Sequence, residues 1–313
     1  VATKPLSLHH YHARSDLMYP LSYIEPLFRP PSEAFSLLLQ VSNGCSWNQC
    51  TFCDMYTQPQ KRFKPRAQAD IDNDLMRVVQ SGMPVRRVFL ADGDAMTLSF
   101  RRLKAIMLSI GAALPEIQRV SAYCLPRNLK NKTVDELAEL QALGLKLLYV
   151  GCESGDDEVL ACIRKGETFA SSQQALQKTK QAGIKSSVMI LNGMGGQQFS
   201  SQHAINSAKL MNICQPEYLA TLVVSLPNGE ARIQEGFEGR FQALTQPQLF
   251  EEIRLFLDHL ELEKTIFRSD HASNYLVLKG VLNKDKQKLL EQVDQAIHRP
   301  ESAGLRQEWQ RGL

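Results

Sequence analysis

The sequence feature that most constrains the fold is a regular alternation of strand-like and helix-like segments over residues 35–297. The strand-like segments are short and apolar, and they span residues 35–41, 87–90, 117–124, 145–150, 184–191, 218–226 and 265–268. The helix-like segments carry apolar residues at helical spacing, and they span residues 70–80, 98–113, 134–143, 171–182, 200–213, 246–260 and 285–297. This order predicts a parallel sheet with covering helices, because parallel strands need long crossover connections.

Six or seven strand–helix units fall short of the eight that close a full barrel. We therefore predict an α/β fold that forms a partial (β/α)6-7 TIM-like barrel, with a doubly wound open sheet as the alternative. Residues 1–33 contain five prolines among scattered aromatic residues, which predicts an irregular N-terminal arm. Residues 34–226 are predicted to form the core, and residues 227–313 a C-terminal helical extension that completes the substrate side.

The composition excludes several classes of protein. Apolar residues make up 43% and charged residues 22% of the 313 residues, as in an ordinary globular chain. No apolar run approaches the roughly 18–20 residues that span a bilayer. Residues 1–8 lack the apolar core of a signal peptide. The net charge of only +3 argues against a nucleic-acid partner. We expect a cytoplasmic protein with no membrane partner.

Three of the seven cysteines lie within nine residues, and this cluster is the main functional signal in the chain. Cys45, Cys50 and Cys53 follow the first predicted strand with the spacing C-x4-C-x2-C. An odd total without regular spacing is a poor disulfide framework, so clustered thiols indicate metal binding or chemistry. Structural zinc and a closed [4Fe–4S] cluster both use four ligands. Three ligands on a [4Fe–4S] cluster leave one iron open to a substrate or cofactor, and three buried structural thiols are the alternative.

With the aromatic Phe52 directly before the last cysteine, this motif resembles the signature of the radical S-adenosylmethionine (radical SAM) superfamily. The usual spacing there is C-x3-C-x2-C, so this chain carries one extra residue. The resemblance implies that Cys45, Cys50 and Cys53 hold a [4Fe–4S] cluster whose open iron binds S-adenosylmethionine (SAM), and that Phe52 lies against the adenine. In that family an electron from the cluster cleaves SAM to methionine and a 5′-deoxyadenosyl radical.

A second motif follows the second predicted strand. Asp92, Gly93 and Asp94 are similar to the Gly-Gly-Glu segment of that family, which takes the amino group of SAM. Here Asp92 replaces a glycine and Asp94 replaces the glutamate. An ordinary Asp-Gly turn is the alternative.

Two further strands are followed by motifs in the same order. Residues 151–155 resemble the Gly-x-Glu-Ser-Gly stretch of the branch that contains oxygen-independent coproporphyrinogen oxidases and tRNA methylthiotransferases. The resemblance implies that Glu153 contacts the SAM ribose and that Ser154 also belongs to the cofactor-binding residues, and capping of the next helix is the alternative. Gly193 and Gly195 resemble a glycine segment that packs near the adenine.

The substrate side carries fewer signals. A polar run at residues 269–274 follows the last predicted strand. His271 is a candidate proton donor and Arg268 a candidate carboxylate-binding residue, with helix caps and loop hydrogen bonds as the alternative. Cys124 and Cys152 end two predicted strands. They are candidates for hydrogen-atom donors or a redox pair, and buried packing is the alternative.

Two basic segments have open roles. Residues 61–66 contain four basic residues that face either an anionic partner or solvent, and these are Lys61, Arg62, Lys64 and Arg66. The histidines His9, His10 and His12 form either a metal site or a polar arm.

The resemblance predicts a radical SAM enzyme that abstracts hydrogen from a small-molecule substrate, with a flavodoxin or ferredoxin as reductant. One alternative is radical SAM modification of tRNA or a peptide. The other is a non-catalytic iron–sulfur electron carrier or a zinc-binding protein.

Overall fold

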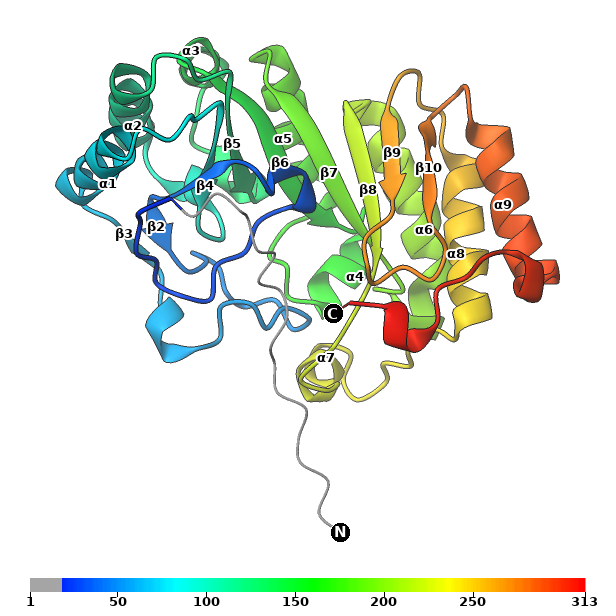
Figure 1. Ribbon diagram of the computed structural model, residues 1–313. Coiled ribbons are helices and arrows are strands. Elements are labelled where there is room, and N and C mark those ends of the chain that lie inside the picture. Colours follow the sequence, from blue (N-terminus) through cyan, green and yellow to red (C-terminus); the bar gives the residue numbers. More distant parts are fainter. Residues whose placement is uncertain (1–18, 313) are drawn as a thin grey trace.

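A single curved sheet organises the molecule. The computed structural model describes residues 19–312, so His9, His10 and His12 lie outside the described residues. The eight strands of the sheet follow chain order and are β1 (Leu37–Gln40), β4 (Arg87–Ala91), β5 (Arg119–Cys124), β6 (Leu145–Glu153), β7 (Lys185–Asn192), β8 (Tyr218–Val223), β9 (Ile266–Ser269) and β10 (Leu278–Val281). Neighbouring strands from β1 to β9 are parallel, and β10 is antiparallel to β9 (Figure 1). The α/β fold and its partial barrel are confirmed.

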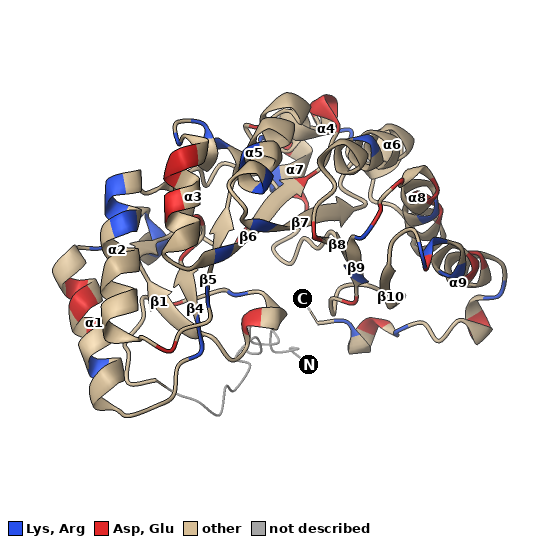
Figure 2. Ribbon diagram, turned by 90° about the horizontal axis from the view of Figure 1, so that it is seen from above, with Lys and Arg blue, Asp and Glu red and all other residues tan. Residues whose placement is uncertain are grey.

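The main helices cover the convex side of the sheet, which curves into an open arc (Figure 2). They are α1 (Gln68–Gln80), α2 (Phe100–Ala113), α3 (Val134–Ala142), α5 (Phe169–Gln181), α6 (Gly196–Cys214), α8 (Gln246–His259) and α9 (Lys286–His298). The helix α3 shows how local sequence determines where a helix begins. Thr133 and Glu136 form the capping box, each side chain accepting from the other's backbone N–H at 3.1 and 2.9 Å.

Side chains alternate between the two faces of the sheet, as the strand period requires. Val88 and Leu90 point to the helices and belong to the large core, whereas Phe89 and Ala91 point into the concave face. There Phe89 packs edge to face against Tyr123 at 5.0 Å between ring centroids. The concave face is therefore filled with aromatic side chains at β4 and β5.

The described part of the N-terminal arm lies along β1 and closes one end of the arc. The Tyr23 hydroxyl donates to the Leu38 carbonyl at 2.9 Å. Glu33 is fully buried and accepts from the Tyr149 hydroxyl at 2.7 Å and from Arg119 at 2.6 Å. Because Arg119 begins β5, Glu33 fixes the arm at the amino-terminal ends of the strands.

Five strands and helices were not expected from the sequence. They are β10, the antiparallel pair β2 (Ser42–Asn43) and β3 (Lys64–Pro65), and the short helices α4 (Asp157–Cys162) and α7 (Ala231–Gly236). The strands β9 and β10 continue the main sheet, so residues 227–313 supply strands as well as helices. The division of the chain into arm, core and extension remains a prediction.

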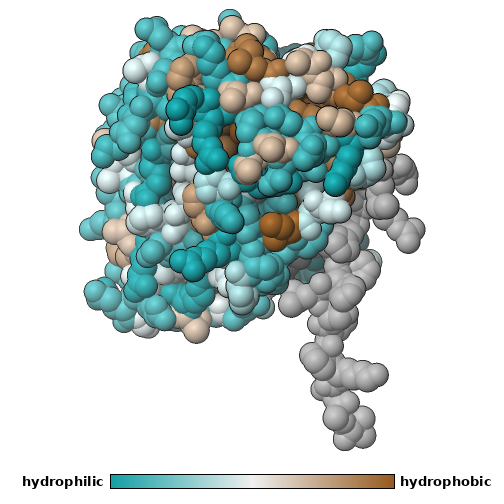
Figure 3. All heavy atoms as spheres, turned by 90° about the vertical axis from the view of Figure 1, so that its left-hand side faces the viewer, coloured by the Kyte–Doolittle hydropathy of each residue, from teal (hydrophilic) through white to brown (hydrophobic). Residues whose placement is uncertain are grey.

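The outer surface on the side of α1 and α2 is mostly hydrophilic, with separate apolar spots (Figure 3). Within residues 19–312, no helix is long and apolar enough to cross a membrane. The basic segment at residues 61–66 does not form one patch. Lys61 is fully buried against Asp92, and Arg66 pairs with Asp74 at 2.6 Å, because both cations satisfy carboxylates inside the fold.

Candidate functional site

The three clustered cysteines lie in the loop that follows β2, at the carboxyl-terminal edge of the sheet, where α/β proteins build their sites. All three thiols are free of disulfides. Burial raises the pKa of Cys45 to about 11 and that of Cys53 to about 12. Thiolates need a nearby positive charge to form at neutral pH, and bound iron supplies it. The donor chemistry therefore fits an iron–sulfur cluster.

Among residues 19–312, no group of three or more His, Cys, Asp or Glu side chains is arranged to hold a metal ion. In a site for a single metal ion, all donor atoms must surround the same position. In a cubane cluster each thiolate binds a different iron, so the three cysteine sulfurs need not converge on one position.

The Cys45 side of the loop is held by the segment after β4. Asp92 accepts from the Gly44 N–H at 3.0 Å and pairs with the buried Lys61. Asp94 accepts from both the N–H of Ser46, at 2.9 Å, and its hydroxyl. Both aspartates thus bind the cysteine loop itself, and their contact with SAM remains a prediction.

Gly93 lies directly against the cysteine loop. Its N–H donates to the Gly44 carbonyl at 3.2 Å. A Cβ added at Gly93 would lie 3.0 Å from the Cβ of Cys45 and 2.8 Å from the ring of Tyr56. Only a glycine fits this close approach without a shift of its neighbours.

The extra residue of the motif lies in a stretch with its own anchors. Asn48 has a left-handed backbone (φ 44°), and its side-chain amide donates to the Tyr56 carbonyl at 2.9 Å. Asn tolerates this conformation better than most residues with a side chain. Trp47 donates to the Arg164 carbonyl at 2.8 Å, and the Arg127 guanidinium lies 3.6 Å from its ring centroid. These contacts accommodate a four-residue spacer between the first two cysteines.

A residue that the sequence did not single out holds the other end of the loop. Arg232 of α7 donates to the Cys53 carbonyl at 2.6 Å and to the Cys50 carbonyl at 2.9 Å, and it also pairs with Asp54. The contacts join residues about 180 positions apart in the chain, and no local pattern marks such a pair.

Glu153 ends β6 beside the cysteine loop. Its backbone is left-handed (φ 64°), and its Oε1 accepts from Lys165 at 2.9 Å. Its Oε2 is buried and has no hydrogen-bond partner among the described residues. A Cβ at Gly151 would collide with this carboxylate. An unpaired buried carboxylate oxygen is costly, so it indicates a donor that a bound molecule supplies.

Lys165 lies between this carboxylate and the cysteine loop. Its Nζ lies 6.0 Å from the ring centroid of Phe52. Burial acts to lower the pKa of Lys165, but the charges of Glu153 and Cys50 outweigh burial and raise the pKa above its usual value. Lys165 is therefore a buried cation beside the cysteine loop.

Ser154, the next residue, turns toward the helices. Its Oγ lies 2.8 Å from His203 Nδ1, and His203 Nε2 lies 3.0 Å from the Leu191 carbonyl oxygen. Because a carbonyl only accepts, Nε2 carries the proton and Nδ1 accepts from the Ser154 hydroxyl. Ser154 thus joins β6 to α6, and its role in binding the cofactor remains a prediction.

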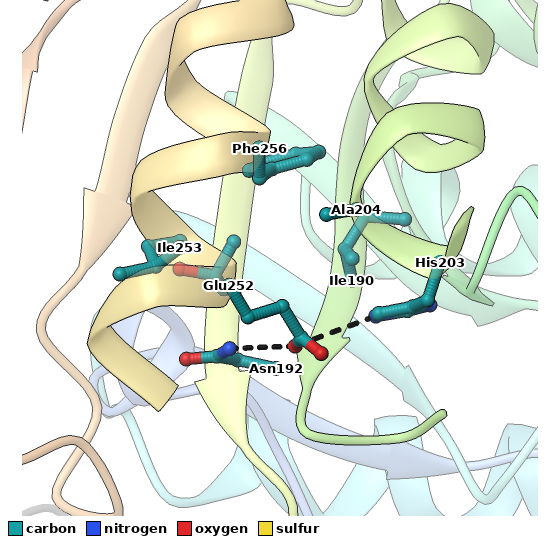
Figure 4. Close-up of a pocket in the computed structure, with 8 residues that line it drawn as sticks. Ile190, Asn192, His203, Ala204, Glu252, Ile253 and Phe256 are labelled. Atoms are coloured by element: carbon teal, nitrogen blue, oxygen red, sulfur yellow. Dashed lines mark hydrogen bonds and ion pairs between the residues drawn. The ribbon is translucent and has the colours of Figure 1, made fainter. Parts of the chain in front are cut away.

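The glycine segment after β7 is held from α8. Glu252 accepts from the Asn192 side chain at 2.7 Å and from the Gly193 N–H at 2.5 Å. Figure 4 shows Glu252 and Asn192 pointing toward each other, with His203 opposite Glu252. These three residues line a cavity of about 10 Å³. Gly193 has φ 88°, and a Cβ at Gly195 would lie 3.0 Å from the Phe199 backbone, so both positions favour glycine.

Arg268 and His271 occupy different surroundings. Phe267 points into the helix-covered core, so the adjacent Arg268 points to the concave face, where it is exposed. No carboxylate in residues 19–312 forms an ion pair with it. His271 Nδ1 lies 2.9 Å from the Ser273 hydroxyl, and Arg306 donates to the His271 carbonyl at 2.6 Å. Burial and then the charge of Arg306 lower the pKa of His271.

Cys124 and Cys152 lie in the large core with Val150 and Leu176. Both are buried, and burial raises the pKa of each thiol. This placement, between the sheet and its helices, favours the packing interpretation over a role on the concave face.

The comparisons with known proteins agree with this geometry. The sequence model of the "Radical SAM superfamily" matches residues 39–207. The chain is 26% identical over 186 residues to the hopanoid C-3 methylase of Methylococcus capsulatus, covering 58% of this chain and 33% of that protein. It is 29% identical over 168 residues to a tRNA-2-methylthio-N(6)-dimethylallyladenosine synthase of Dehalococcoides mccartyi, covering 52% and 38%. The chain thus spans little more than a third of these curated relatives.

Among solved structures, the fold is similar to that of coproporphyrinogen III oxidase (HemN) from Escherichia coli. The TM-score is 0.53 at 15% sequence identity, and the match covers 71% of this chain and 52% of the oxidase chain. This likeness supports the partial barrel.

Proposed function

Because the chain belongs to the radical SAM superfamily, whose members bind a [4Fe–4S] cluster and SAM, we propose that it abstracts hydrogen from a small molecule bound on the concave face of the sheet. The observation that carries the proposal is the loop of three free thiols beside an unpaired buried carboxylate oxygen, that of Glu153. A cluster and SAM, when bound, supply the electron and the hydrogen-abstracting radical.

The chain's own residues would bind and orient these groups. Cys45, Cys50 and Cys53 are the proposed cluster ligands. Glu153 Oε2 is placed to accept from a sugar hydroxyl, since it lacks any donor among the described residues. The proposed roles of Asp92, Gly93 and Asp94 are to fix the Cys45 side of the loop, and Gly93 leaves room for backbone approach to a ligand.

An apolar cluster links the cysteine loop to the concave face. Phe52 packs in the same cluster as Met189 of β7 and Leu222 of β8, and both strand residues are partly exposed. Such a lining excludes water from a site, which a radical reaction requires. Gly193 and Gly195 follow β7, and we propose that they pack near the adenine.

Arg268 is the proposed anchor of the substrate. Gly151, Met189, Ala220 and Arg268 form one row across β6 to β9. Three strand spacings separate the ends of this row, about 14 Å along the sheet. A small molecule that extends from the cysteine loop would meet a guanidinium that forms no ion pair among residues 19–312, and a guanidinium can bind carboxylate or phosphate with two hydrogen bonds. His271 remains a candidate proton donor, in the loop that Arg306 holds through the His271 carbonyl.

Radical SAM enzymes need a reductant, and we propose a flavodoxin or a ferredoxin for this role.

The test is to reconstitute the protein with iron and sulfide without oxygen, and then to add SAM and dithionite. We expect 5′-deoxyadenosine to form, measured by chromatography, and Cys53→Ala to lose both the cluster absorbance and this product. The matched control is Cys162→Ala, because Cys162 lies on α4 outside the motif. An intact, reduced cluster that yields no 5′-deoxyadenosine would contradict the proposal.

A further inference from the structure

We propose that Arg232 is a positioning residue that clamps the Cys50–Cys53 half of the cysteine loop. One guanidinium donates to the carbonyls of two proposed ligands, Cys53 at 2.6 Å and Cys50 at 2.9 Å. It also forms an ion pair with Asp54, the residue after the last cysteine. The planar guanidinium suits this task, since its N–H groups point in fixed directions.

The clamp completes a set of anchors along the loop. The Cys45 half is held by Asp92 and Asp94, through Gly44 and Ser46. In the Cys50 half, the backbone bonds of the loop are a 2.9 Å bond from the Thr51 N–H to the Ile163 carbonyl and a long 3.3 Å bond from the Cys53 N–H to the Cys50 carbonyl. Arg232 therefore supplies a large share of the fixed contacts on that half.

The helix that carries Arg232 is firmly seated. Ile233 and Phe237 are buried in the apolar cluster that also contains Phe52. A Cβ at Gly236 would collide with the Cys162 carbonyl, so α7 lies directly against the end of α4. A rigid carrier lets the guanidinium hold the loop in one geometry.

The inference rests on the proposed function only where it assigns Cys50 and Cys53 to a cluster. It predicts two effects of Arg232→Gln. In the protein without a cluster, the amides of residues 50–54 exchange hydrogen at least tenfold faster. After reconstitution, an iron chelator bleaches the cluster at least fivefold faster. Arg240→Gln is the matched control, since Arg240 follows α7, is exposed, and within residues 19–312 forms its one ion pair with the exposed Glu238.

Two further variants keep the inference falsifiable if Arg232→Gln fails to fold. Arg232→Lys keeps the charge and loses the paired donors, so both effects should persist. Asp54→Asn removes only the acidic partner, and we expect a smaller acceleration of exchange. Equal exchange at residues 50–54 in the Arg232 variants and in Arg240→Gln would overturn the clamp. The exchange measurement needs no cluster, so it decides the matter even if the proposed function fails.

Discussion

Glu153 is the residue whose surroundings most directly indicate a bound ligand. One oxygen of its carboxylate accepts from the buried Lys165, and the other, Oε2, has no donor in the part of the chain that the structure describes. A Cβ at the nearby Gly151 would lie 2.3 Å from Glu153 Oε1, so a larger residue there would displace the carboxylate from this position. A carboxylate that is half satisfied by the protein is suited to bind a hydroxyl group of a ligand and to choose among ligands by that contact.

We predict that Glu153→Gln weakens SAM binding to the reconstituted protein about tenfold, which corresponds to about 1.4 kcal/mol. The amide keeps the shape but loses the charge that strengthens the hydrogen bond. Equilibrium dialysis with labelled SAM measures the effect. Glu158→Gln is the control, because Glu158 is exposed on α4. Equal SAM affinity in both variants would show that Glu153 does not contact the cofactor.

Some residues of the site lie in short sequence motifs, and others are brought to the site only by the fold. The cysteines and the segments at 92–94 and 151–155 lie in short motifs, so the sequence predicts them. Arg232 has no such motif, because its partners are distant in sequence and only the fold brings them together. The sequence also could not show that the extra spacer residue is accommodated with a left-handed Asn48.

At the scale of elements, α6 and α8 hold the ends of β6 and β7 from the convex side. His203 of α6 links Ser154 to the Leu191 carbonyl, and Glu252 of α8 binds Asn192 and Gly193. Ser200 also donates to Glu252, at 2.6 Å. The concave site is therefore shaped in part by a polar network in the helix layer behind it.

We predict that Glu252→Gln lowers the free energy of unfolding by about 2 kcal/mol. The buried carboxylate accepts from three donors, whereas Gln loses the charge that strengthens these bonds and replaces the oxygen that accepts from Ser200 with an NH₂ group. Urea denaturation of the protein without a cluster measures the change. Glu251→Gln, at the exposed neighbour on the same helix, should change the stability by less than about 0.5 kcal/mol. A similar loss in both variants would contradict the network's role.

The elements that the sequence missed are short or lack a pattern. The helices α4 and α7 have six residues each, too few for a helical period to be visible. The strand β10 has four residues and breaks the strand–helix alternation by pairing antiparallel to β9. The long parallel elements were predictable because each buries an apolar face with a constant period.

At the scale of the whole molecule, the open arc determines what can reach the site. The seven parallel strands and β10 do not close into a barrel, and β1 and β10 remain the two edges. The concave face is filled by aromatic residues at β4 and β5, whereas at β8 and β9 Ala220 is partly exposed and Arg268 is exposed. The exposed guanidinium therefore lies at the open side of the arc, away from the aromatic residues.

We predict that the substrate is an anion held by Arg268. A cell extract, filtered to remove macromolecules, is separated on an anion-exchange resin, and each fraction is tested for increased 5′-deoxyadenosine release. We expect the active fraction to be retained by the resin. Arg268→Gln should reduce this stimulation at least tenfold and leave the substrate-free rate unchanged, because Arg268 lies far from the cysteine loop. Arg299→Gln, at an exposed arginine after α9, should respond as the unaltered protein does. Three outcomes would contradict an anionic small-molecule substrate at this residue. They are stimulation by fractions that the resin does not retain, stimulation only by the macromolecules that the filter removes, and equal stimulation of both variants.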